Sequence, residues 1–76
     1  MDVMRETGNL RVYRKDGTYY CSETVNGKFR RLKVNKDRAE TLAKMPQANF
    51  VESIKQLIDG AQASGSANYF ECIDKR

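Results

Sequence analysis

The chain has 76 residues, of which 14 are Lys or Arg and 10 are Asp or Glu, so its formal net charge is +4. This length supports one domain with one modest core. The absence of His excludes a Ser-His or Cys-His nucleophile pair and a His-ligated metal site, and two Cys are too few for a four-thiolate zinc site. We therefore expect a protein that is not an enzyme and that uses no metal or other cofactor.

No segment reaches the run of about 18 apolar residues that crosses a membrane, and the chain opens without a secretory leader. We therefore expect a cytoplasmic protein. Residues 1–38 hold ten basic and five acidic side chains, whereas residues 39–76 hold four basic and five acidic ones. This asymmetry favours a polyanion or an acidic protein surface as partner, and the alternative is a solvated basic face that only maintains solubility.

Residues 1–8 mix charge and polarity without a period, which predicts a loose N-terminus. Strand-like segments then follow, separated by the dipeptides Asp16-Gly17 and Asn26-Gly27. Both dipeptides favour type I′ hairpin turns, because their residues tolerate the positive φ that such turns need. The segments between them are rich in Val, Tyr, Thr and Phe. Residues 9–34 are therefore predicted to form a three-stranded antiparallel sheet.

Two-residue turns would fix the register of this sheet, with Lys15 facing Thr18 and Val25 facing Lys28. Successive side chains would then point to opposite faces. One face offers apolar residues to a core, namely Val12, Tyr19, Cys21, Leu32 and Val34, with Leu10 at its margin. The other face is basic and aromatic, and it carries Arg11, Tyr13, Lys15, Tyr20, Phe29, Arg31 and Lys33.

Residues 37–59 predict a helical cover for the apolar face. Asp37 and Glu40 have the spacing of a capping box that opens a short helix, which Pro46 would end. A second helix would begin at Asn49 and stop at Gly60, with apolar residues at the helical period: Phe50, Val51, Ile54, Leu57 and Ile58. The expected fold class is α+β, a three-stranded meander packed by one or two helices.

Residues 61–66 predict a flexible connection, and residues 68–73 a short terminal strand. This strand would either add to a sheet edge or pair with a second copy of the chain to form a homodimer. Cys21 and Cys72 could form a disulfide if the strand lay beside the middle one. A reducing compartment favours two buried thiols instead.

The basic and aromatic face is the predicted binding surface. Basic side chains neutralise phosphates, a small sheet fits the major groove, and aromatic rings stack on unpaired bases. We expect DNA as the ligand, with duplex favoured. The alternative is an inhibitor or adaptor of phage type that binds an acidic or nucleic-acid-binding protein through the same residues, since Arg and aromatic side chains are typical interface anchors. Aromatic pairs that only stabilise an exposed sheet remain the structural alternative.

Residues 10–49, LRVYRKDGTYYCSETVNGKFRRLKVNKDRAETLAKMPQAN, resemble the N-terminal arm-type DNA-binding domain of phage integrases of the tyrosine-recombinase family. The matching features are DGTYYC at 16–21, Gly27-Lys28, the basic strand that follows, and KDRA at 36–39. The resemblance implies a three-stranded sheet followed by a helix, with a DNA-facing set of Arg11, Tyr13, Tyr20, Arg31 and Lys33. Because the chain lacks the recombinase catalytic domain, it implies an accessory or regulatory factor rather than an integrase.

Overall fold

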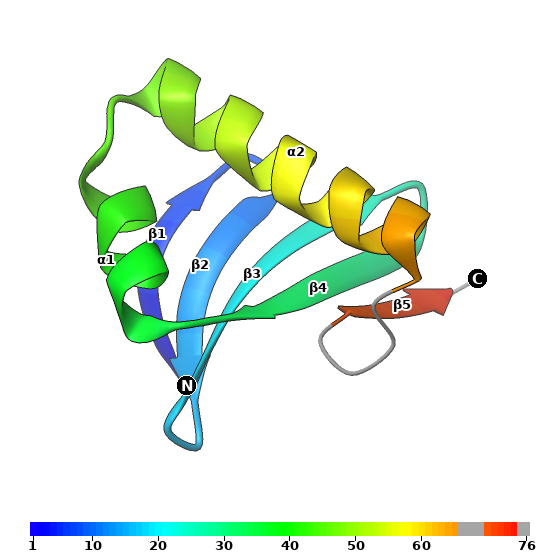
Figure 1. Ribbon diagram of the computed structural model, residues 1–76, viewed down its shortest axis with the longest axis horizontal. Helices are drawn as coiled ribbons and strands as arrows, with labels where there is room; N and C mark the ends of the chain where they lie inside the picture. Colours follow the sequence, from blue (N-terminus) through cyan, green and yellow to red (C-terminus); the bar gives the residue numbers. More distant parts are fainter. Residues whose placement is uncertain (66–69, 75–76) are drawn as a thin grey trace.

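The computed structural model describes residues 1–65 and 70–74 and has an α+β fold, as predicted (Figure 1). Five antiparallel strands lie in one sheet in chain order: β1 (Asp2–Thr7), β2 (Leu10–Lys15), β3 (Thr18–Val25), β4 (Lys28–Val34) and β5 (Phe70–Asp74). Two helices, α1 (Lys36–Lys44) and α2 (Gln47–Ser64), follow β4 and cover one face of the sheet (Figure 1). The other face carries no helix from the described residues, and we call it the open face.

The two predicted hairpin turns and the predicted register are confirmed. Asp16 and Asn26 have φ angles of 53° and 51°, and the glycine after each has a φ of 79°, as a type I′ turn requires. Strands β2, β3 and β4 pair without an irregularity, so that Tyr13 faces Tyr20 and Tyr20 faces Lys33. The predicted apolar set of side chains therefore lies on one face of the sheet and the basic and aromatic set on the other, as expected.

The prediction of a loose N-terminus is wrong, because residues 2–7 form β1 and pair with β2. Gly8 and Asn9 make the two-residue connection, with Gly8 at a φ of 59° and Thr7 facing Leu10. The register shifts by one residue between Val3 and Arg5, which is the signature of a bulge. This shift interrupts the alternation that would have marked the strand, so β1 was not predicted. The sheet contains β1 and the terminal strand in addition to the three-stranded meander.

Helix α1 begins one residue before the predicted capping box. Asn35 is its N-cap, and the Oδ1 atom of Asn35 accepts a hydrogen bond of 2.7 Å from the backbone N–H of Arg38. The predicted box of Asp37 and Glu40 therefore does not cap this helix. Asp37 instead lies in the first turn, where a carboxylate is favoured by the helix dipole.

Helix α2 is longer at both ends than the sequence indicated. It begins at Gln47, directly after Pro46, and it continues through Gly60 to Ser64. Gly65 ends it in the left-handed conformation (φ 68°), and its N–H donates to backbone carbonyls of the last turn. Residues 61–64 of the predicted flexible connection thus belong to the helix, and residue 66 lies outside the described residues. Within the described ranges, neither helix combines the length and apolar character needed to cross a membrane.

The core lies between the helices and the predicted apolar face of the sheet. Its buried members come from β2, β3, β4 and both helices: Leu10, Val12, Cys21, Leu32, Ala39, Leu42, Phe50, Ile54 and Ile58. Phe50, Ile54 and Ile58 recur every four residues, so one stripe of α2 faces the sheet. Burying each side chain of this size contributes about 1.5–3 kcal/mol, which makes this layer the main source of stability.

Arg5 of β1 joins the sheet to both helices. Its Nη1 donates to the backbone carbonyl oxygen of Leu42 at 3.1 Å and to that of Met45. Its guanidinium carbon also lies 4.3 Å from the centre of the Phe50 ring. A cation is favoured at a helix C-terminus, where the last carbonyls lack partners within the helix. The first strand is therefore tied to the end of α1 and the start of α2.

Strand β5 adds to the outer edge of β4, with Phe70 facing Leu32 and Cys72 facing Arg30. Residues 68 and 69 of the predicted strand lie outside the described residues. Because β5 lies beside β4 and not beside β3, the two cysteines are unbonded; Cys21 is buried and Cys72 exposed. The expectation of two buried thiols is thus correct for Cys21 only. Burial raises the pKa of the Cys21 thiol from 9.0 to about 12.

Candidate binding surface

All seven residues of the predicted binding surface lie on the open face, but they differ in exposure. Lys15 and Lys33 are exposed, and Tyr13 is only 3% exposed. The other four are partly buried: Arg11, Tyr20, Phe29 and Arg31. The register thus brings the seven to one face, whereas the packing of side chains on that face decides which of them a ligand can reach.

A row of side chains crosses all five strands of the open face. Glu6 faces Arg11, Arg11 and Arg31 both face Ser22, and Arg31 faces Glu71. The Nε of Arg11 donates to a carboxylate oxygen of Glu6 at 2.9 Å, and an Nη of Arg31 donates to one of Glu71 at 3.0 Å. Each arginine of the row is therefore paired with a carboxylate from an edge strand.

Tyr13, Tyr20 and Arg31 form a second set of contacts across β2, β3 and β4. The two tyrosine rings stack with their centres 5.3 Å apart and their planes 25° apart. The guanidinium carbon of Arg31 lies 4.3 Å from the centre of the Tyr20 ring. Tyr13 and Glu71 raise the pKa of Arg31, which stays charged. Tyr13 therefore packs within the face, and its ring is not presented to a ligand.

Lys15 and Lys33 are the exposed cations of this face. Lys15 faces Thr18 beside the β2–β3 turn, and Lys33 faces Tyr20 two positions further into the sheet. Neither lysine makes an ion pair with another residue of ranges 1–65 and 70–74. Four cations and two carboxylates point from the described strands to this face, which leaves it with a charge of +2.

Sequence reasoning missed Glu6 and Glu71 as members of this surface. The dipeptide Gly8-Asn9 is a recognised hairpin signal, and a two-residue turn there places Glu6 opposite Arg11. No comparable local signal exists for Glu71, because two helices separate β5 from β4 in the chain. Its register depends on how the terminal strand docks.

A second ionic network lies on the helix side of the sheet. Glu23 is only 5% exposed and pairs with Arg30, whose other terminal nitrogen donates to Asp59 at 2.9 Å and to Gln62 at 2.8 Å. The hydrogen bond to Glu23 is the main cause that raises the pKa of Arg30. This network joins β3 and β4 to α2, and we assign it a structural role.

The described part of the chain offers no metal site, since it brings no three His, Cys, Asp or Glu side chains close enough to hold an ion. Comparison of the chain with models of protein families, with curated proteins and with solved structures finds no match.

Proposed function

We propose that the open face docks on the phosphate backbone of duplex DNA. The observation that carries this proposal is the pair of exposed lysines, Lys15 and Lys33, at one end of the open face. Cations that contact phosphates release condensed counterions, and this release supplies most of the affinity that does not depend on sequence. The resemblance of residues 10–49 to arm-type domains also favours DNA as the ligand of this face.

The packing of the aromatic residues favours duplex over single-stranded DNA. Stacking on unpaired bases needs exposed ring faces, but Tyr13 is buried and Tyr20 already contacts Tyr13 and Arg31. The ion pair of Arg11 with Glu6 has side chains that are 40% and 48% exposed. Exposed pairs of this kind contribute at most about 1 kcal/mol. A phosphate can therefore compete with Glu6 for Arg11 at little cost.

The test is the salt dependence of binding to a labelled duplex of random sequence, measured by fluorescence anisotropy. Lys15→Ala and Lys33→Ala should each weaken binding, and each should reduce the slope of log K against log salt by about 0.9, the value of one phosphate contact. Lys55→Ala is the matched control, because Lys55 is an exposed lysine on α2, on the other side of the molecule. Binding that is independent of salt, or an equal loss in the control, would contradict the proposal.

A protein partner at the same face is the second candidate, and the aromatic stack favours it. Tyr20 and Arg31 are held in contact before any ligand arrives, and residues of these types dominate the energetics of protein interfaces. Affinity capture from lysate with and without nuclease separates the two candidates. A partner retained after nuclease, and lost in Tyr20→Ala, would support the protein; a partner lost after nuclease would support DNA.

A further inference from the structure

A groove lies between the two helices and extends to strand β4. One cavity of about 530 Å³ lies between α1 and α2, and its apolar lining consists of Leu42, Met45 and Leu57. An adjoining cavity of about 380 Å³ has an apolar lining of Leu32, Val34, Leu57 and Ala61, and Lys33 of β4 also lines it. Both cavities are also lined by Asn35 and Arg38. They therefore form one continuous feature, the helix groove, in which Arg38 and Leu57 lie between two ends that are each lined by apolar and polar side chains.

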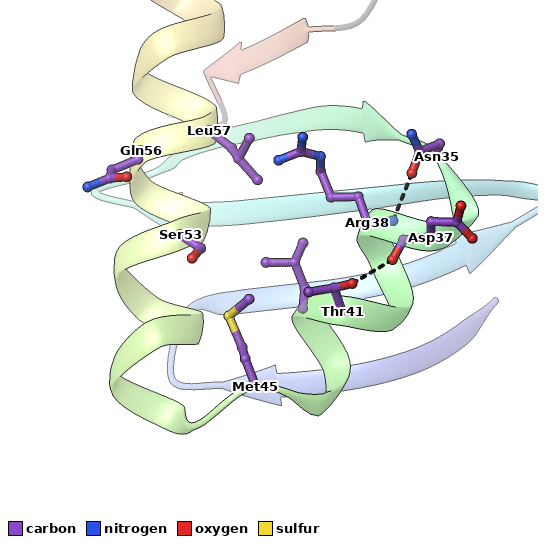
Figure 2. Close-up of a pocket in the computed structure, with 9 residues that line it drawn as sticks. Asn35, Asp37, Arg38, Thr41, Met45, Ser53, Gln56 and Leu57 are labelled. Carbon is purple, nitrogen blue, oxygen red and sulfur yellow. Dashed lines mark hydrogen bonds between the residues drawn. The ribbon is translucent and has the colours of Figure 1, made fainter.

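Arg38 is the cation common to both ends of the groove. Figure 2 shows its guanidinium extending from α1 toward Leu57 of α2, while the carboxylate of Asp37 points away from it. The backbone N–H of Arg38 is bonded to Asn35. Its guanidinium makes no hydrogen bond or ion pair within ranges 1–65 and 70–74. The positive charge thus lies over apolar surface without a described carboxylate to balance it.

The sequence of α1 explains why Arg38 has no partner on its own helix. Side chains three and four residues apart are neighbours on a helix surface. The positions that follow Arg38 at these spacings are Thr41 and Leu42, and neither carries a negative charge. The charge is therefore available to an anion that enters the groove, and the bond it would form is of the strong, charge-assisted kind.

We propose that the helix groove binds a segment of a partner protein in which two apolar side chains flank an Asp or a Glu. The carboxylate pairs with Arg38, and one apolar side chain enters each end of the groove. Each cavity has a volume within the range of ligand sites. Arg38 lies between apolar side chains at the two ends of the groove, and this arrangement matches a peptide better than a small ion or a single apolar chain. An amphipathic helix provides the pattern when its acidic residue has apolar residues three and four positions away on either side.

The probe is an alanine-based helical peptide of about 16 residues with one glutamate between two leucines at these spacings. A matched peptide carries glutamine in place of the glutamate. Titration is followed by NMR shifts of Met45, Leu57 and Ala61, which line the groove. The glutamate peptide should bind at least about tenfold more tightly than the glutamine peptide, and Arg38→Gln should remove the difference. Lys44→Gln makes the same charge change on α1 outside both cavities and should have no effect.

Reversing the charge of Arg38 and of the peptide together tests the same contact by a gain of binding. A variant that fails to fold cannot produce such a gain. Arg38→Glu should reject the glutamate peptide and accept a peptide with lysine at that position. Lys15→Ala should bind the glutamate peptide as the wild type does, because Lys15 lies on the open face and lines neither cavity of the groove. Equal binding of the glutamate and glutamine peptides would overturn the proposal. So would shifts confined to the open face, equal shifts with acetate alone, or a groove already covered by a second copy of the chain.

Discussion

Replacement of Arg5 by alanine should lower the free energy of unfolding by about 3 kcal/mol. The change removes the hydrogen bonds from the guanidinium to the carbonyl oxygens of Leu42 and Met45, and its contact with the ring of Phe50. A hydrogen bond to a charged group contributes about 1.5–3 kcal/mol, and a cation over an aromatic ring about 0.5–2 kcal/mol. These contributions share one side chain and overlap, so we expect a loss well below their sum.

Thermal unfolding followed by circular dichroism measures this loss. A domain of this size shifts its melting temperature by about 4–8 °C for each kcal/mol, so Arg5→Ala should melt roughly 12–24 °C below the wild type. Arg11→Ala, which removes an exposed ion pair from the neighbouring strand, should lose no more than about 1 kcal/mol. Arg5→Lys should lie between the two, because lysine keeps the charge but not the planar group of donors. Equal losses in Arg5→Ala and Arg11→Ala would refute the reasoning.

Two further predictions concern the glycines of α2 and the buried thiol. Gly60→Ala should stabilise the protein by about 0.5–1 kcal/mol in urea titrations, because a Cβ there meets open space inside the helix, whereas Gly65→Ala should destabilise it by about 1 kcal/mol because of its positive φ. One thiol, that of Cys72, should react with a thiol reagent in the native state and two after unfolding. Because the pKa of Cys21 rises from 9.0 to about 12 on folding, its stabilisation is complete below pH 9 and is lost as the pH rises toward 12. Wild type should therefore lose up to about 1.4 kcal/mol per pH unit relative to Cys21→Ala across that interval.

Much of the sheet could be predicted because its determinants are local. Asp16-Gly17 and Asn26-Gly27 set both turns, and period-two alternation then decides which side chains face the core. The ends of the helices were less predictable, since several residues offered similar signals. Asn35 and Asp37 are both good caps, and Gly60 and Gly65 are both good stops. At the end of α2, Ala61 packs against the core, which favours continuation of the helix past Gly60.

For the candidate surface, too, the features set by local sequence were predicted, and most of those set by contacts between distant segments were not. The seven residues were placed on one face by their register, but the burial of Tyr13 and the carboxylate partners of the two arginines were not foreseen. Those partners come from β1, whose alternation is broken by a bulge, and from β5, which follows two helices. The pairing of Arg31 with Glu71 joins strands that are distant in sequence, so no local pattern predicts it, whereas the pairing of Arg11 with Glu6 follows from the turn at residues 8–9. The lysines that remain exposed could be identified only once these pairs were known.

Glu6 and Glu71, which end the row of side chains across the open face, also affect contacts between copies of this protein at high concentration. Edge strands expose unpaired backbone groups, and sheets that meet edge to edge can grow into aggregates. Here both edges carry a glutamate on the open face, Glu6 on β1 and Glu71 on β5, and β1 is further distorted by its bulge. Whichever edges two copies bring together, a carboxylate of one copy approaches an edge that already holds a carboxylate of the other. The residues that balance the arginines within one molecule thus also discourage its sheet from extending into the next.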